Sequence, residues 1–163
     1  APSTQVTLVE YHHAAWDHYF LTGNPVEIAQ LDNGTFAGWA RTGYEFKAYD
    51  SAGANGSSVC RFFSTSFAPR SSHFYTASPT ECALVAGSPD WSMEGVVFSL
   101  PIPDQDGTCR TGTRPIYRLY NNGLGGTPNH RYTIDPAVRL QMIERGWTPE
   151  ERAPAVPGMC AVD

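Results

Sequence analysis

The chain has 163 residues and a formal charge of −5, with 17% charged and 12% aromatic residues, 15 glycines and 13 prolines. This length suits one domain with a buried core, and the turn-rich composition favours many short strands over an all-helical fold. The eleven Lys and Arg residues are scattered, and no run of about 18 apolar residues could span a membrane. We therefore expect a single, mainly β domain over 1–163 that neither binds nucleic acid nor inserts into a membrane.

The first segment, 6–50, begins with the alternating apolar run "VTLVEYH", which predicts a half-buried strand. After the loop "HAAWD", the run "HYFLT" from His18 predicts a second strand. Asn24 and Pro25 are typical of an N-cap and a first helical position, so a helix of about two turns should follow. Trp39 and the strand-like "YEFKAY" complete the segment.

The second segment, 57–101, contains "SVCRFF", then "HFYT" from His73, a helix start at Ser78 and Pro79, Trp91 and the strand-like "MEGVVFSL". The third, 113–161, contains "PIYRLY", His130, a helix start at Asp135 and Pro136, and Trp147. It ends in "APAVPGMC", whose prolines predict an edge segment. Glu27 and Glu81 each follow an N-cap by three residues, a spacing that predicts capping boxes.

Three landmarks recur with nearly one period. The histidines are 55 and 57 residues apart, the helix prolines 54 and 57, and the tryptophans 52 and 56. This agreement predicts three strand–strand–helix–strand repeats, at about 6–50, 57–101 and 113–161. One such unit cannot bury its own apolar face, so we expect the three to pack around a pseudo-threefold axis with β-trefoil-like or propeller-like closure.

The four cysteines lack the spacing of a zinc site and allow three disulfide pairings. We expect Cys60–Cys82, which would join a strand to the helix of its own segment, and Cys109–Cys160, which would tie the chain end to the start of the third segment. Disulfides indicate an oxidising compartment, and the start "APSTQ" is typical of a mature terminus or a linker. The expected location is secreted, periplasmic or on the cell surface, as a monomer or as part of a larger secreted chain.

The motifs "YR-[FL]-[FY]", "HFYT", "P-x-E" and a Trp-led strand resemble a secreted repeat family of bacteria and fungi that is catalogued only as a domain of unknown function. The resemblance covers nearly the whole chain. It implies an accessory domain of secreted hydrolases or surface proteins, and hence binding more than catalysis. The third segment departs from the pattern, because Arg131 replaces the aromatic residue after His and no Glu follows Pro136, so the segments need not share one function.

Under a threefold axis, His18, His73 and His130 could converge as a zinc or copper site. The favoured interpretation is that each ring is a partly buried tether to backbone carbonyls. We therefore expect no metal and no cofactor. No pair of carboxylates and no nucleophile motif predicts a catalytic residue.

The aromatic residues point instead to a sugar, since their rings combine an apolar face with a polar edge. Trp39, Trp91 and Trp147 recur with the period and are expected in the core. Arg61 and Arg118 occupy matching strand positions, either in a shared type of pocket or on the solvent face. The predicted ligand-binding residues are Trp16, Asp17, Arg61, Arg118, Tyr120, Asn121 and Asn122.

The predicted function is a non-catalytic module that binds a polysaccharide or cell-surface glycan through the loops in which the segments differ. One alternative is a secreted hydrolase or metalloprotein with a His-lined site. The other is a protein-docking adhesive or spacer domain.

Overall fold

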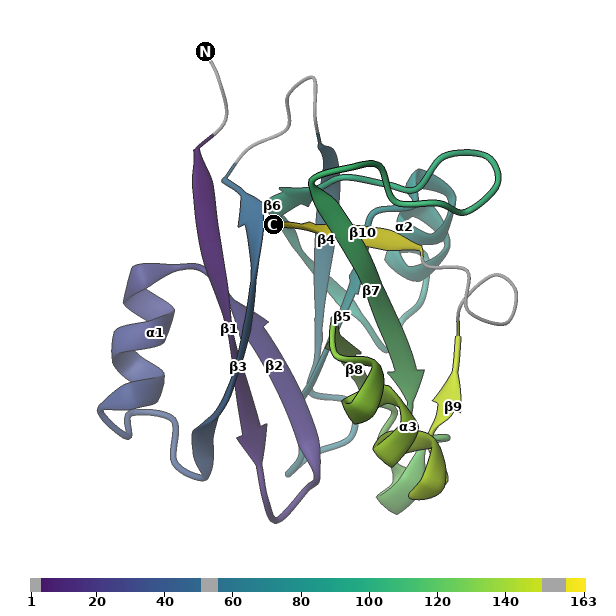
Figure 1. Cartoon of the computed structure of the whole chain (residues 1–163). Helices are drawn as coiled ribbons and strands as arrows, with labels where there is room; N and C mark the ends of the chain where they lie inside the picture. The colour runs from purple at the N-terminus through teal and green to yellow at the C-terminus, as the bar shows by residue number, and fades with distance from the viewer. Residues whose placement is uncertain (1–3, 51–55, 151–157) are drawn as a thin grey trace.

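The computed structural model describes residues 4–50, 56–150 and 158–163. Figure 1 shows a mainly β protein with three short helices, which confirms the predicted fold class at this level. The first segment contains β1 (Gln5–His13), β2 (His18–Thr22), α1 (Pro25–Asp32) and β3 (Trp39–Tyr49). The second contains β4 (Ser57–Ser64), β5 (Ser72–Thr76), α2 (Pro79–Ala86) and β6 (Ser92–Leu100). The third contains β7 (Thr113–Tyr120), a 3-10 turn (Leu124–Gly126), β8 (His130–Thr133), α3 (Pro136–Glu144), β9 (Thr148–Pro149) and β10 (Met159–Val162).

The strands form one antiparallel sheet whose hydrogen-bonded path runs β5-β4-β6-β3-β10-β7-β8. Strand β1 pairs with β2 and β3, and β9 pairs with β7. This path is open, and the pairings of the described strands do not show the expected trefoil or propeller closure. The predicted edge segment, 153–160, falls partly on 151–157, outside the described residues. From Met159 the chain forms β10, which lies between β3 and β7 and is therefore not an edge strand.

The helices begin where the sequence predicts. Each starts at its proline, and the side chains of Asn24, Ser78 and Asp135 accept hydrogen bonds from backbone N–H groups of the first turn. In Figure 1 the three helices lie at separate positions around the sheet, with α1 beside β1 and β3.

Each segment begins with a hairpin: β1–β2, β4–β5 and β7–β8. Two tyrosine hydroxyls connect the second strands of these three hairpins. The Tyr75 hydroxyl donates to the carbonyl of Leu21 on β2 at 2.6 Å and accepts from its N–H at 3.0 Å. The Tyr132 hydroxyl on β8 binds the carbonyl and N–H of Tyr75 at 2.8 and 2.9 Å. Because all three residues are buried, each hydroxyl satisfies two backbone groups that water cannot reach. These bonds link β2, β5 and β8 within the main hydrophobic core, to which Leu21, Tyr75 and Tyr132 all belong.

Two disulfides join Cys60 to Cys82 and Cys109 to Cys160, which is the expected pairing. The first links β4 to α2. The second links the loop before β7 to β10. Among the described residues, no helix has both the length and the apolar character needed to cross a membrane.

Candidate binding site: two matching pockets

Arg61 on β4 is the centre of the first pocket. Its Nη1 and Nη2 donate to the two carboxylate oxygens of Glu27 on α1, at 2.9 and 2.7 Å. Its Nε donates to Glu94 Oε1 on β6 at 2.7 Å. The Arg61 side chain is only 9% exposed, so one buried cation is held between two carboxylates from different segments.

His73 on β5 lies beside this cluster. Its Nε2 is 3.3 Å from Glu94 Oε1, and its ring packs against Phe20 and Phe63, with centroid distances of 4.5 and 4.9 Å. The Arg61 guanidinium also lies over the Phe20 ring, 5.2 Å from its centroid. Aromatic and ionic groups therefore share one wall of the pocket.

The first pocket has a volume of about 280 Å³. Its rim carries Trp39, which is half-buried, and Phe36, which is 48% exposed. The described residues that line it are Phe20, Glu27, Gln30, Leu31, Phe36, Trp39, Arg61, Phe63, Ser71, His73 and Glu94.

Arg118 on β7 is the centre of a second pocket of about 270 Å³. Its Nη1 and Nη2 donate to Glu81 of α2 at 2.8 and 3.1 Å, and its Nε is 3.2 Å from Glu150 Oε1. His130 Nε2 lies 2.6 Å from the same oxygen of Glu150. The lining is Phe74, Glu81, Val85, Trp91, Arg118, Tyr120, Pro128, His130 and Glu150.

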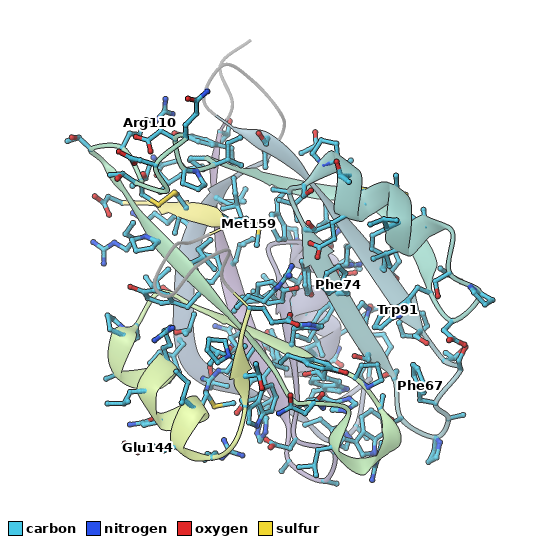
Figure 2. All side chains as sticks on the ribbon, turned by 90° about the vertical axis from the view of Figure 1, so that its right-hand side faces the viewer. Phe67, Phe74, Trp91, Arg110, Glu144 and Met159 are labelled. Atoms are coloured by element: carbon cyan, nitrogen blue, oxygen red, sulfur yellow. A yellow bond between two sulfur atoms is a disulfide. The ribbon has the colours of Figure 1, made fainter. Side chains whose placement is uncertain are left out.

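Figure 2 labels two aromatic residues of the second pocket, Phe74 and Trp91, whose ring centroids are 6.3 Å apart. The Arg118 guanidinium lies 5.2 Å from the Phe74 centroid, the same distance that separates Arg61 from Phe20. The Tyr120 ring stacks on His130 with a centroid distance of 4.8 Å.

The two pockets match position by position. Arg61 faces Tyr75 across its hairpin and Arg118 faces Tyr132, while Phe63 faces His73 and Tyr120 faces His130. The matching pairs are Phe20 and Phe74, Glu27 and Glu81, Leu31 and Val85, Trp39 and Trp91, Arg61 and Arg118, Phe63 and Tyr120, Ser71 and Pro128, His73 and His130, and Glu94 and Glu150. Among the described lining residues, Gln30 and Phe36 of the first pocket have no counterpart in the second.

The electrostatics of the pockets also agree. Burial raises the pKa of Glu27 and Glu81, but hydrogen bonds from Arg61 and Arg118 outweigh it and leave both pKa values below the ordinary range. For Glu94 and Glu150, burial is likewise outweighed by the neighbouring histidine and arginine, so their pKa values are lowered too. Burial lowers the pKa values of His73 and His130. At neutral pH each pocket therefore holds two carboxylates, one guanidinium and a neutral imidazole.

The corresponding position between the third and first segments is filled. Glu10 stands where the other hairpins have Arg61 and Arg118, since it faces Leu21. Arg131 stands where they have Phe20 and Phe74, and its guanidinium binds Glu10. The side chains packed there are almost completely buried, so this place is closed: Glu10, Arg131, Val138, Met142 and Trp147 are between 1% and 7% exposed.

The structure separates the predicted ligand-binding residues into groups. Arg61 lies in the first pocket, and Arg118 and Tyr120 lie together in the second. Trp16, Asp17 and Asn121 line a different hollow of about 220 Å³.

In this hollow the polar groups already have partners within the protein. Asp17 binds His12 at 2.8 Å and Arg145 at 2.7 Å, and Trp16 stacks on His13 with a centroid distance of 3.7 Å. The Asn121 side chain donates to the Thr127 carbonyl at 2.9 Å. The hollow is thus held together by internal contacts.

Asn122 has a φ of +59° and binds the Gly146 carbonyl and the Thr148 hydroxyl, both at 2.8 Å. It therefore holds the loop after β7 against the end of α3.

The three histidines do not converge on a metal site, and no cluster of potential metal ligands occurs in the described residues. His18 is completely buried, with Nδ1 2.8 Å from the Ser71 carbonyl, and is thus the tether to backbone that was expected. His73 and His130 bind carboxylates instead. The hairpin register explains the difference, because Tyr19 rather than His18 occupies the position of His73 and His130.

Sequence reasoning missed the four carboxylates of the pockets. It assigned Glu27 and Glu81 to capping boxes, but the N–H groups of Asn24 and Ser78 donate to Thr22 and Thr76, so these carboxylates are available to the arginines. Trp39 and Trp91 were expected in the core and are half-buried at the pockets, whereas Trp147 is buried. One sequence signal indicated that His18 is not equivalent to His73 and His130: Pro25 follows His18 by seven residues, but Pro79 and Pro136 follow their histidines by six.

A larger hollow, about 450 Å³, shares Glu81, Arg118 and Glu150 with the second pocket. It is also lined by Gly158, which together with Glu150 flanks the stretch 151–157 outside the described residues.

A family model matches residues 9–156, which is most of the chain. The chain belongs to DUF5648, a domain of unknown function. No curated protein and no solved structure matches this chain. The membership of DUF5648 agrees with the resemblance to a family of unknown function, and the two matching pockets give this DUF5648 chain its candidate site.

Proposed function

We propose that this DUF5648 chain is a non-catalytic module that binds a polysaccharide or cell-surface glycan through the first and second pockets. The proposal depends on one observation: an arginine, two glutamates, a histidine, a phenylalanine and a tryptophan occur at matching positions in both pockets, with similar contacts. We further propose that the three segments are repeats of one unit. Packing of a core does not require the two buried arginines, because apolar residues in place of a buried ion pair would give similar stability. Their presence at matching positions therefore supports a role in binding.

The composition of the pockets suits a sugar. Trp39 and Trp91 offer apolar ring faces on which a pyranose can stack, and the carboxylates can accept hydrogen bonds from its hydroxyls. Volumes of about 280 and 270 Å³ suit one sugar unit at a time.

The same residues do not favour glycoside hydrolysis. That reaction needs a carboxylic acid whose pKa is raised so that it can protonate the leaving oxygen. The pKa values of all four pocket carboxylates are lowered instead, those of Glu27 and Glu81 by an arginine and those of Glu94 and Glu150 by the neighbouring histidine and arginine. These groups are acceptors for a bound ligand rather than acids.

We propose a secreted or cell-surface location for the module, as an accessory part of a larger protein. The two disulfides support an oxidising compartment.

The test is a panel of immobilised glycans, followed by calorimetric titration of any ligand found. Trp39→Ala and Trp91→Ala should each weaken binding, and the double variant should abolish it. Phe67→Ala is the control, because Phe67 is half-buried but lines neither pocket (Figure 2).

Two outcomes would contradict the proposal. If no glycan binds the parent protein, the function as a glycan module is wrong. If Trp16→Ala abolishes binding while the Trp39→Ala/Trp91→Ala variant binds like the parent, the site lies in the loop hollow instead.

A further inference from the structure

In the first pocket the donor nitrogens of Arg61 and His73 already face carboxylates. Each of the three nitrogens of Arg61 donates to a carboxylate, two to Glu27 and one to Glu94. His73 Nε2 is 3.3 Å from Glu94, and as the neutral ring has one N–H, its donor faces this carboxylate. The charged and imidazole side chains therefore have few donors left for a ligand.

The second pocket is similar. Arg118 donates to both oxygens of Glu81, and its Nε lies 3.2 Å from Glu150 Oε1 as an ion pair without a hydrogen bond. His130 Nε2 is 2.6 Å from Glu150, which leaves Nδ1 as the acceptor of the ring. Among the described residues this buried Nδ1 has no hydrogen-bond partner, and the His130 side chain is only 10% exposed.

Hydrogen-bond acceptors, in contrast, remain available to a ligand in both pockets. All the contacts of Glu94 with Arg61 and His73 involve Oε1, and the side chain is 31% exposed. Glu150 likewise contacts Arg118 and His130 through Oε1 and is 30% exposed. A carboxylate can accept about four hydrogen bonds, so the second oxygen of each can still receive a donor.

The charge of each pocket favours the same kind of ligand. Two carboxylates and one guanidinium leave a net charge of −1, because the buried imidazole is neutral. Aromatic faces such as those of Trp39 and Trp91 are negative as well and attract cations. An anionic ligand would meet like charge, and among the described lining residues both guanidiniums are already paired with carboxylates.

Building on the proposed glycan-binding function, we infer that each pocket recognises a sugar unit with a protonated amine, that is, a glycan of amino sugars without N-acetyl groups. The pyranose face packs on Trp39 or Trp91. The ammonium donates to Glu94 or Glu150. Uronic acids and sulfated or sialylated sugars are excluded by charge.

Calorimetry with three soluble probes of equal length tests the inference at a pH at which the amine is protonated. The probes are oligomers of β-1,4-linked glucosamine, N-acetylglucosamine and glucose, and an oligogalacturonate serves as the anionic comparison. The glucosamine oligomer should bind about tenfold more tightly than the other two, because only its ammonium can form a charge-assisted hydrogen bond with the carboxylate. The oligogalacturonate should not bind.

The variant Glu94→Gln/Glu150→Gln should bind all three oligomers with similar affinity, because it removes the charge and keeps an acceptor. Glu144→Gln is the matched control. Glu144 is exposed at the end of α3, away from Phe74 and Trp91 in Figure 2, so its loss should leave the preference unchanged. A circular dichroism melt of each variant checks folding.

The outcomes separate this inference from the proposed function. Equal binding of the acetylated and free-amine oligomers would overturn the amine preference and leave glycan binding intact. Binding of the oligogalacturonate would also overturn it. Lack of binding to any glycan would remove the proposed function itself. If simple alkylamines bind as tightly as the glucosamine oligomer, the pockets recognise ammonium without the sugar, and the amino-sugar assignment is wrong.

Discussion

Arg131 donates to both carboxylate oxygens of Glu10, at 3.1 and 2.8 Å, although the two residues are 121 positions apart. Their side chains are only 8% and 3% exposed. The contact joins β8 of the third segment to β1 of the first. It also fills the position that is a pocket at the other two junctions between segments, so two open sites and one closed junction coexist in the chain.

The Glu10–Arg131 pair should therefore be costly to break. Glu10→Gln leaves a buried guanidinium without its counter-ion and should lower the free energy of unfolding by about 3–5 kcal/mol. The double variant Glu10→Gln/Arg131→Met should recover much of this loss, because neither charge remains. Urea unfolding of both singles and the double gives the coupling energy.

The surface pair Arg114–Asp163 is the control for this cycle. Its ion pair is similarly short, 2.7 Å, but the side chains are 53% and 47% exposed. Arg114→Met should cost about 0–1 kcal/mol. Additive effects of Glu10→Gln and Arg131→Met would show that the two buried groups are not coupled.

The Tyr75 hydroxyl should be important for stability. Tyr75→Phe leaves the buried N–H and carbonyl of Leu21 unpaired and should cost about 1–3 kcal/mol. Tyr132→Phe should have a similar effect through the backbone of Tyr75. Tyr117→Phe is the matched control on β7, where the half-buried ring lies near Arg139. If Tyr75→Phe unfolds at the same urea concentration as Tyr117→Phe, the hydroxyl is not the link between the hairpins.

Local features were predictable from sequence because they depend on neighbouring residues. Asn24, Ser78 and Asp135 cap helices that begin at the next proline, and alternating apolar runs form strands. The pockets were not predictable in this way. Arg61 and Glu27 are 34 positions apart, and their contact exists only after two segments pack together.

The difference between His18 and the other two histidines has a physical cause as well. The sequence period predicts that the three histidines are equivalent positions of the repeat. In the hairpins, however, the residue six positions before the helix proline is equivalent in each segment, and in the first segment this residue is Tyr19. A shift of one residue moves a side chain to the opposite face of a strand. His18 consequently lies in the interior against Ser71, while His73 and His130 line the pockets.

The two disulfides should contribute unequally. Cys109–Cys160 closes a stretch of 51 residues, and Cys60–Cys82 closes one of 22. In the chain-entropy account the longer loop loses more conformational freedom, so removal should cost roughly 4 kcal/mol for the first and roughly 3 kcal/mol for the second. Urea unfolding of the Cys109→Ala/Cys160→Ala and Cys60→Ala/Cys82→Ala variants measures both. A larger loss for the Cys60–Cys82 pair would show that local packing of α2, rather than loop length, sets the contribution.

The stability of the protein should fall in two stages as the pH is lowered. Burial lowers the pKa values of His13, His18, His73 and His130 below their ordinary value of 6.5. The unfolded chain therefore binds more protons than the folded one just below pH 6.5, and the free energy of unfolding decreases there as the pH falls.

The second stage involves carboxylates. The pKa values of Glu27, Glu81, Glu94 and Glu150 lie below their ordinary value of 4.5 in the folded protein, so the stability that they contribute is present above pH 4.5 and is lost as the pH falls through the lowered values. Thermal melts between pH 8 and pH 3 should show a melting temperature that is flat above about pH 7, declines below about pH 6.5 and declines more steeply below about pH 4.5. In His73→Gln/His130→Gln the first decline should become shallower without disappearing, because His13 and His18 remain. A variant with the parent's full slope between pH 7 and pH 5 would show that the pocket histidines are not the groups that titrate.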